Sequence, residues 1–187
     1  MSMKGDKKPV AFIEDCAVSL DHLADYTARL NEIFKKYNTS GMFYAHASVG
    51  TLHIRPVLNM KSDEDIKNMK SISEETFEMV KDYKGSHSGE HGDGIVRSEF
   101  HEMMFGKKII NAFEEIKDTF DNKNLLNPGK IVRPYKSNDR SLMRYKSGYQ
   151  ANKITTHYDW SNWGQFSDAV EMCNNNGACR KLDSGVR

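Results

Sequence analysis

The chain has 187 residues, which suits one domain with appendages and is long enough to bury a sizeable core. Its 27 basic and 26 acidic residues give a formal net charge of +1, so no global field attracts nucleic acid or an anionic membrane surface. No run of about 18 apolar residues occurs, and no apolar segment follows the charged start, which argues against a spanning helix or a signal peptide and predicts a cytoplasmic protein.

The first elements expected along the chain are a strand and a helix. Residues 9–15 form a short, β-prone apolar run. Apolar residues then recur at three- and four-residue spacing over 20–37, with charged residues between them, which predicts an amphipathic helix lying on a sheet. Ser19 stands where it could cap that helix.

A β-hairpin is expected next. The runs 41–48 and 51–57 are rich in β-forming residues, and Val49-Gly50 between them predicts a tight two-residue turn. In that register His46 lies directly opposite His53, and Tyr44 opposite Arg55.

Helical patterning dominates the middle of the chain. Residues 62–83 predict one helix or two, with a break near 71–73, and residues 107–121 predict another that stops before Asn127-Pro128-Gly129. The glycine-rich run 85–94 cannot be a helix, so we expect a loop or extended segment with unusual backbone angles. This order predicts an α+β fold, with helices on one face of an antiparallel sheet.

Two histidines of the hairpin are candidates for metal binding. Side chains of opposed residues share a face of the sheet with Cβ atoms roughly 5 Å apart, which would let His46 and His53 converge on one ion. Two half-exposed histidines in a hairpin remain an equally open interpretation.

The glycine-rich run adds a carboxylate and a third histidine. Glu90 and His91 stand between Gly89 and Gly92, where another group can approach the backbone closely. This pair has the composition of a third metal ligand and a general base, although GEHGDG is also compatible with a polar surface loop. We interpret His87, His101 and His157 as surface or packing residues.

The polar tail, residues 135–187, is interpreted as a linker towards a second module. Only residues 166–172 look helical. Cys173 and Cys179, with Gly177 between them, fit the start of an iron-sulfur ligand series, but such clusters usually take four thiolates. No GxGxxG or Walker-type loop occurs, so the dinucleotide contacts of a flavin are not encoded here.

Four segments together carry a family resemblance: AFIED, YAHASVGTLHIRP, SGEHGDGIVRSEF and LLNPGKIV. In this order and spacing they resemble the C-terminal domain of FAD-linked oxidases of the vanillyl-alcohol-oxidase superfamily, in the branch of D-lactate, glycolate and D-2-hydroxyglutarate dehydrogenases. The resemblance implies a ferredoxin-like substrate and metal domain over 1–134. The tail ending CNNNGACRKLDSGVR resembles the entry to the ferredoxin-like iron-sulfur module that follows this domain in large bacterial members, so 135–187 is expected to be a linker and the beginning of a 4Fe-4S module.

The resemblance also implies roles for individual residues. His46, His53 and Glu90 match the ligands of a divalent metal, most plausibly zinc, and His91 matches the residue thought to act on the substrate hydroxyl. Asn127 matches a position near the flavin. Many relatives have Asn two residues after the second histidine where this chain has Arg55, which we expect to bind the substrate carboxylate.

The implied activity is oxidation of a D-2-hydroxy acid by hydride transfer to FAD, in a protein whose FAD-binding domain is absent from this chain. The 187 residues alone are therefore expected to be inactive. Electrons would leave through the iron-sulfur module to an acceptor that could bring the protein to the membrane periphery. A non-catalytic metal-binding or interaction module is the alternative; structural zinc sites usually have four protein ligands, and three are counted here. An electron-transfer protein would need four cysteines in the tail, where two occur.

Overall fold

A computed structural model describes residues 3–173, 176–177 and 180 of the chain. Its strands are β1 (Lys7–Pro9), β2 (Cys16–Ala17), β3 (Gly41–His46) and β4 (Thr51–Asn59). Its α-helices are α1 (Leu23–Lys36), α2 (Asp63–Asp82), α3 (Gly94–Arg97), α4 (His101–Phe105), α5 (Lys107–Phe120) and α6 (Phe166–Val170). Short 3₁₀ turns occupy Leu20–His22, Ala47–Val49, Ser98–Phe100 and Ser161–Trp163.

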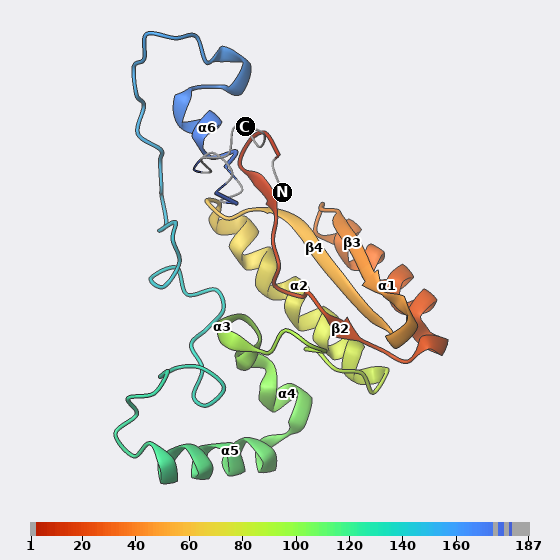
Figure 1. Ribbon diagram of the computed structural model, residues 1–187. Helices are drawn as coiled ribbons and strands as arrows, with labels where there is room; N and C mark the ends of the chain where they lie inside the picture. The colour runs from red at the N-terminus through yellow and green to blue at the C-terminus, as the bar shows by residue number, and fades with distance from the viewer. Residues whose placement is uncertain (1–2, 174–175, 178–179, 181–187) are drawn as a thin grey trace.

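Strand β4 is the centre of an antiparallel sheet (Figure 1). Strand β3 pairs along one edge of it, from Gly41 opposite Pro56 to His46 opposite Thr51. Strands β1 and β2 follow one another along the other edge. The chain between β1 and β2 stays close to β4, because the Val10 N–H donates to the Pro56 carbonyl at 2.8 Å.

The glycine-rich run continues the sheet beyond β2. Ser86 and Ala17 exchange backbone hydrogen bonds of 2.8 and 2.9 Å, and the Gly89 N–H donates to the Asp15 carbonyl at 2.9 Å. A Cβ on Gly89 would lie 2.8 Å from that carbonyl oxygen, so glycine permits the close approach. The order strand, helix, hairpin, helix, edge segment is that of a ferredoxin-like βαββαβ unit.

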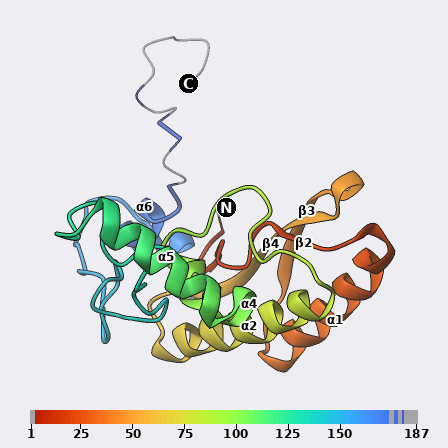
Figure 2. The ribbon, with the colours of Figure 1, turned by 90° about the horizontal axis from the view of Figure 1, so that it is seen from below.

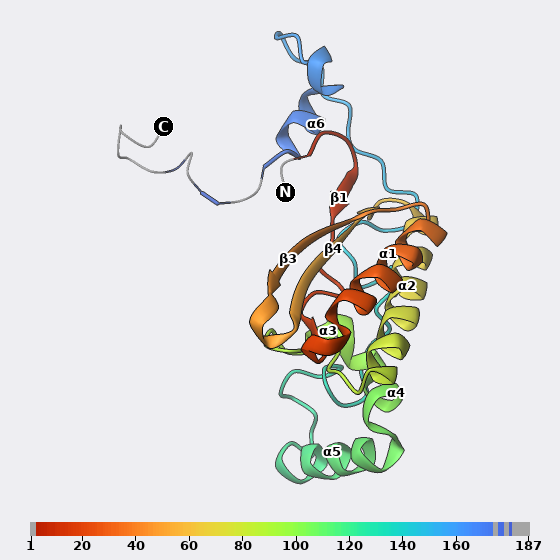
Figure 3. The same cartoon turned by 90° about the vertical axis from the view of Figure 1, so that its right-hand side faces the viewer.

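Helices α1 and α2 cover one face of the sheet and leave the other face open (Figure 3). Alternate residues of a strand point to opposite faces, and Leu52, Ile54 and Leu58 of β4 point into the core under the helices. The other members include Tyr26, Leu30, Phe34, Ile72, Phe77 and Val80. The predicted α+β fold is confirmed. Position 53 therefore faces away from the helices.

Two strand predictions need correction. Residues 9–15 form no continuous strand: β1 ends at Pro9, and the chain bends until Asp15, whose φ of 65° is left-handed. The hairpin turn is also longer than predicted, because Val49 is unsuited to the positive φ of a primed turn. Ala47–Val49 instead forms a 3₁₀ turn, and Gly50 takes the left-handed φ of 72°.

The helices match their predicted positions with smaller differences. Residues 63–82 form one unbroken helix, in which the Ser73 hydroxyl donates to the Met69 carbonyl and thereby satisfies its polar group within the helix. Ser19 precedes a 3₁₀ turn rather than α1 and makes no capping hydrogen bond through its side chain.

Helix α5 lies below the sheet in Figures 1 and 3, and it is therefore in front in Figure 2, which is seen from below. It buries none of its residues fully, and its apolar side chains include the exposed Ile116 and Phe120. Among the described residues, no helix is long and apolar enough to cross a membrane.

Candidate functional site

The predicted metal ligands of the hairpin lie on the open face of the sheet. The actual register places Tyr44 opposite His53 and His46 opposite Thr51, so the prediction that His46 and His53 are direct partners is wrong. The register differs by two residues, and strand side chains repeat every two, so both histidines keep the same face. Their ring centroids are 5.0 Å apart.

Glu90 brings a carboxylate to these two rings. Its Oε1 lies 2.9 Å from His53 Nε2 and 3.5 Å from His46 Nε2. The three ligand atoms lie within 4.8 Å of one another, and His53 is buried while the other two side chains are half-exposed. Two imidazoles and one carboxylate are a donor set that zinc accepts, so these residues fit the divalent metal implied by the resemblance.

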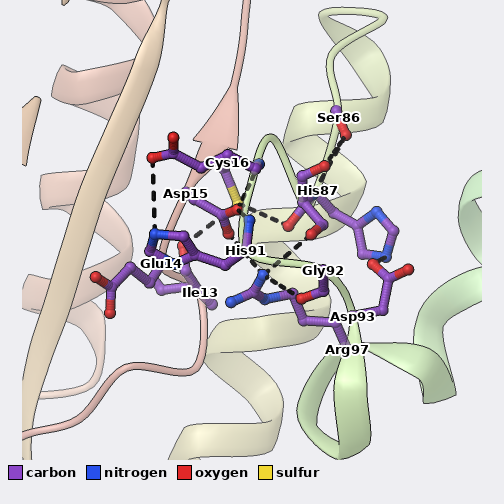
Figure 4. Close-up of polar contacts among 12 residues, drawn as sticks. Ile13, Glu14, Asp15, Cys16, Ser86, His87, His91, Gly92, Asp93 and Arg97 are labelled. Atoms are coloured by element: carbon purple, nitrogen blue, oxygen red, sulfur yellow. Dashed lines mark hydrogen bonds and ion pairs between the residues drawn. The ribbon is translucent and has the colours of Figure 1, made fainter. Parts of the chain in front are cut away.

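A buried ion pair holds the Glu90 segment in place (Figure 4). Asp15 is fully buried, and its Oδ2 accepts the backbone N–H groups of Glu90 and His91 at 2.8 and 2.7 Å. Its Oδ1 accepts from Arg97 Nη1 at 2.6 Å. Arg97 also donates to Ser88 Oγ at 3.1 Å and to a backbone carbonyl in the same segment at 3.0 Å. Charge-assisted hydrogen bonds from the buried Asp15 and Arg97 side chains thus fix the backbone that carries Glu90 and His91.

A second carboxylate, Glu14, occupies the other side of His53. Arg55 donates to it from Nε at 3.0 Å and from Nη2 at 2.8 Å, and these hydrogen bonds hold the pKa of Glu14 below its usual range. Glu14 Oε1 also lies 3.6 Å from His53 Nδ1. The guanidinium fork that we expected to bind a substrate carboxylate is therefore turned towards Glu14.

A cavity of about 470 Å³ opens beside these groups. Its lining combines apolar and aromatic side chains with both charges of the Glu14–Arg55 pair, and comprises Pro9, Glu14, Met42, Phe43, Tyr44, His53, Arg55 and His91. The volume falls within the range of small-molecule sites. Chemically, the arrangement offers a candidate metal site, an imidazole and a cation around one cavity.

His91 lines the cavity beside His53. Its ring stacks on that of His53 with a centroid distance of 4.9 Å, and its Nε2 is 3.6 Å from Glu90 Oε1. His91 also forms, with Glu14 and His53, a second group whose ligand atoms lie within 4.8 Å of one another. His53 belongs to both groups.

Glu14 and Asp15 are residues of the candidate site that the sequence reasoning missed, because both were assigned to a plain strand. The signal for them was the acidic pair that ends AFIED, since buried carboxylates need cationic partners. Arg55 and Arg97 supply those partners.

The remaining predicted residues lie elsewhere. Asn127 has a positive φ of 48° and lines a separate cavity of about 550 Å³ beside α5. Cys173 is exposed in the tail, and Cys179 lies outside the described residues. His87 and His101 are buried, and His157 is exposed.

Comparison with known proteins finds a family model and several related sequences. The family model described as "FAD linked oxidases, C-terminal domain" matches residues 1–131. The D-2-hydroxyglutarate dehydrogenase of Haemophilus influenzae is 36% identical over 180 residues, which are 96% of this chain and 17% of that protein. The glycolate oxidase subunit GlcD of Bacillus subtilis is 32% identical over 66% of this chain and 26% of its own length. The D-lactate dehydrogenase of Archaeoglobus fulgidus is 32% identical over 71% of this chain and 29% of its own length. The chain thus spans a small part of each relative.

Proposed function

Because this chain belongs to the family of FAD-linked oxidases, whose C-terminal domain it contains, we propose that it supplies the substrate and metal site of a flavin-dependent dehydrogenase. The substrate class we propose is a D-2-hydroxy acid, D-lactate or D-2-hydroxyglutarate, oxidised to the 2-oxo acid. The relatives it resembles carry the names of such dehydrogenases, and they are several times longer than this chain. We therefore propose the activity for a longer protein that contains this domain.

The observation that carries this proposal is the position of the metal residues at the edge of a cavity. His46, His53 and Glu90 bring three donor atoms together, and the cavity beside them is lined by His91 and Arg55. Three protein ligands next to an open cavity are typical of catalytic rather than structural zinc sites. This argues against the alternative of a non-catalytic metal-binding module.

In this proposal His46, His53 and Glu90 hold the divalent ion. When bound, such an ion lowers the pKa of a hydroxyl group beside it, and a flavin supplies the hydride acceptor. His91 accepts the hydroxyl proton, because its imidazole lines the cavity next to the metal residues. Asp15 keeps His91 in position through the backbone hydrogen bond.

Arg55 contributes positive charge to the cavity. Its Nε and Nη2 are engaged by Glu14, so we propose that it attracts a substrate carboxylate through its charge and its remaining N–H groups. Glu14 orients it for this task. A substrate with a carboxylate next to the hydroxyl would then place its carboxylate at Arg55 and its hydroxyl at His91.

Other parts of the longer protein are proposed from the same resemblance. Residues 1–134 form the substrate domain, and residues 135–187 lead to a 4Fe-4S module that Cys173 and Cys179 begin. Two thiolates do not complete a cluster, so further cysteines would follow in the longer protein. Asn127 would contact the flavin from the cavity that it lines beside α5.

Kinetics of the full-length protein test the roles of the histidines. In the His53→Ala variant we expect metal content to fall and activity to return partly with excess zinc. In the His91→Ala variant we expect normal metal content and a decrease in turnover of about 100-fold to 10,000-fold, the usual range for loss of a general base. His157→Ala is the matched control, since that histidine is exposed outside the site.

The same assay identifies the alternatives. If His91→Ala loses its metal and is rescued by excess ion, His91 is a ligand, as in the group with Glu14 and His53. If none of the variants changes the oxidation of D-lactate or D-2-hydroxyglutarate, the proposed function is wrong. Arg55→Ala should mainly raise KM for the carboxylate substrate, with a smaller effect on metal content.

A further inference from the structure

A further group of two histidines and an aspartate has its possible ligand atoms close together, apart from the open face of the sheet. His87 comes from the glycine-rich run, Asp93 stands just before α3, and His101 is the first residue of α4. The His87 and His101 side chains are 1% and 3% exposed, and that of Asp93 is 22% exposed. None of the three belongs to the ligand groups of the open face.

The spacing of their donor atoms fits a small tetrahedral ion. Asp93 Oδ1 lies 3.4 Å from His87 Nε2, and Asp93 Oδ2 lies 3.0 Å from His101 Nε2. With bond lengths of about 2.0–2.1 Å, neighbouring ligands of tetrahedral zinc are about 3.3 Å apart. The two imidazole rings are perpendicular, at 88°, with a centroid distance of 5.5 Å. Both rings therefore turn one nitrogen towards the same carboxylate.

Most of these buried ligand atoms make no hydrogen bond to any described residue. Both ring nitrogens of His87, the Nε2 of His101 and the Oδ1 of Asp93 have no hydrogen-bond partner in this part of the chain. Phe77 and Phe105 pack against the His87 ring. Buried polar atoms without partners are costly, and a bound cation is one way to satisfy several of them at once.

The tautomer of His101 strengthens this argument. Its Nδ1 lies 3.3 Å from the carbonyl oxygen of Ile131, so it must carry the proton if it makes that hydrogen bond. In the neutral ring the Nε2 then presents a lone pair to the Asp93 carboxylate, and two acceptors would face each other. A hydrogen bond from Nδ1 to a carbonyl is also the usual support behind a metal-bound histidine.

We propose that His87, Asp93 and His101 bind a second divalent ion of the zinc class, with a structural role. The two Nε2 atoms and the Asp93 carboxylate are the protein donors, and the burial of both rings argues for a structural role. His87 and Asp93 stand three residues before and after Glu90, so this ion clamps both ends of the segment that carries Glu90 and His91. Because His101 is the first residue of α4, the same ion would also connect this segment to α4.

Zinc stoichiometry of the 187-residue chain tests this proposal. We expect two zinc ions per wild-type chain and one in the His53→Ala variant, because His53 belongs to both ligand groups of the open face. The double variant His53→Ala/His101→Gln should bind none. A His53→Ala chain that binds no zinc, or a double variant that binds as much as His53→Ala, would overturn the second site. If the wild-type chain binds one zinc ion, which His53→Ala keeps and the double variant loses, the open face binds no zinc. That result would contradict the proposed function and leave this second site standing.

A measurement on the wild-type chain removes the dependence on folding of the variants. Nitrogen NMR of the histidine rings should show the Nε2 resonances of His87 and His101 shifting when zinc is added to metal-free protein. The competing interpretation is a protonated His101 paired with Asp93 and no metal. In that case these resonances would not respond to zinc, and the proposal would be wrong.

Discussion

The ion pair between Asp15 and Arg97 gives the sharpest stability prediction, because both side chains are buried and one of them holds the site backbone. Replacing Arg97 with Ala leaves the Asp15 carboxylate buried with only its two backbone donors. Loss of one partner from a buried pair costs about 3–5 kcal/mol. Domains of this size are stable by about 5–15 kcal/mol in total. Arg97→Ala should therefore remove a large part of the free energy of unfolding.

Urea unfolding followed by circular dichroism measures this change. At roughly 2–4 °C per kcal/mol for chains of 150–250 residues, the melting temperature should also fall by about 6–20 °C. Lys35→Ala is the control: its ion pair with Glu32 has side chains 72% and 69% exposed. Exposed pairs of this kind contribute about 0–1 kcal/mol.

Two results would refute this reasoning. One is an Arg97→Ala variant as stable as Lys35→Ala. The other is a double variant, Asp15→Asn/Arg97→Met, that is much less stable than Arg97→Ala, because removal of both charges should recover part of the loss by leaving no charge uncompensated.

Three further predictions concern single residues. Burial raises the pKa of the Cys16 thiol to about 12, so iodoacetamide at pH 8 should not modify Cys16 in the folded chain, as judged by mass spectrometry; rapid modification would contradict its burial. Although burial opposes it, hydrogen bonds from Lys70 and from a backbone N–H lower the pKa of Glu99 to about 2. The stability that Lys70→Met removes should thus be complete above about pH 4.5 and decline as the pH falls towards 2; a pH-independent loss in urea titrations would refute this. Gly50→Ala should destabilise more than Gly92→Ala: both glycines have a positive φ, but only the new Cβ at Gly50 would meet a backbone carbonyl, at 1.9 Å, and equal melting temperatures would contradict it.

The sheet and the location of the site could be predicted because they depend on side-chain periodicity. The sequence reasoning placed His46 and His53 two residues out of register, yet correctly on one face, since a shift of two leaves every side chain on its own face. Because the shift in register was an even number of residues, the error in the predicted hairpin turn did not move either histidine to the other face. A shift of one would have separated the two rings.

The partners of the site residues were harder to predict because they come from distant parts of the sequence. Asp15 and Arg97 are 82 residues apart, and no periodic pattern connects them. Asp15 takes a left-handed backbone conformation, which nothing in AFIED announces. His87 and His101 were interpreted as surface or packing residues; both are buried, and the carboxylate that they share became visible only when α3 and α4 were placed. Local sequence patterns therefore predict the candidate ligands, but they do not predict the distant residues that hold those ligands in place.

The order in which the strands occur has a consequence for synthesis of the chain on the ribosome. Strands β1 and β2 are made first, but their partner β4 begins about 35 residues after β2 ends. The β3–β4 hairpin is local and closes quickly, whereas the first segment must wait for a longer loop to close. Glu14 and Asp15 lie on this first segment, between β1 and β2, and Arg97 is synthesised after β4 and α2. We therefore expect the candidate site to be completed in the last steps of folding, after the hairpin and its helices have formed.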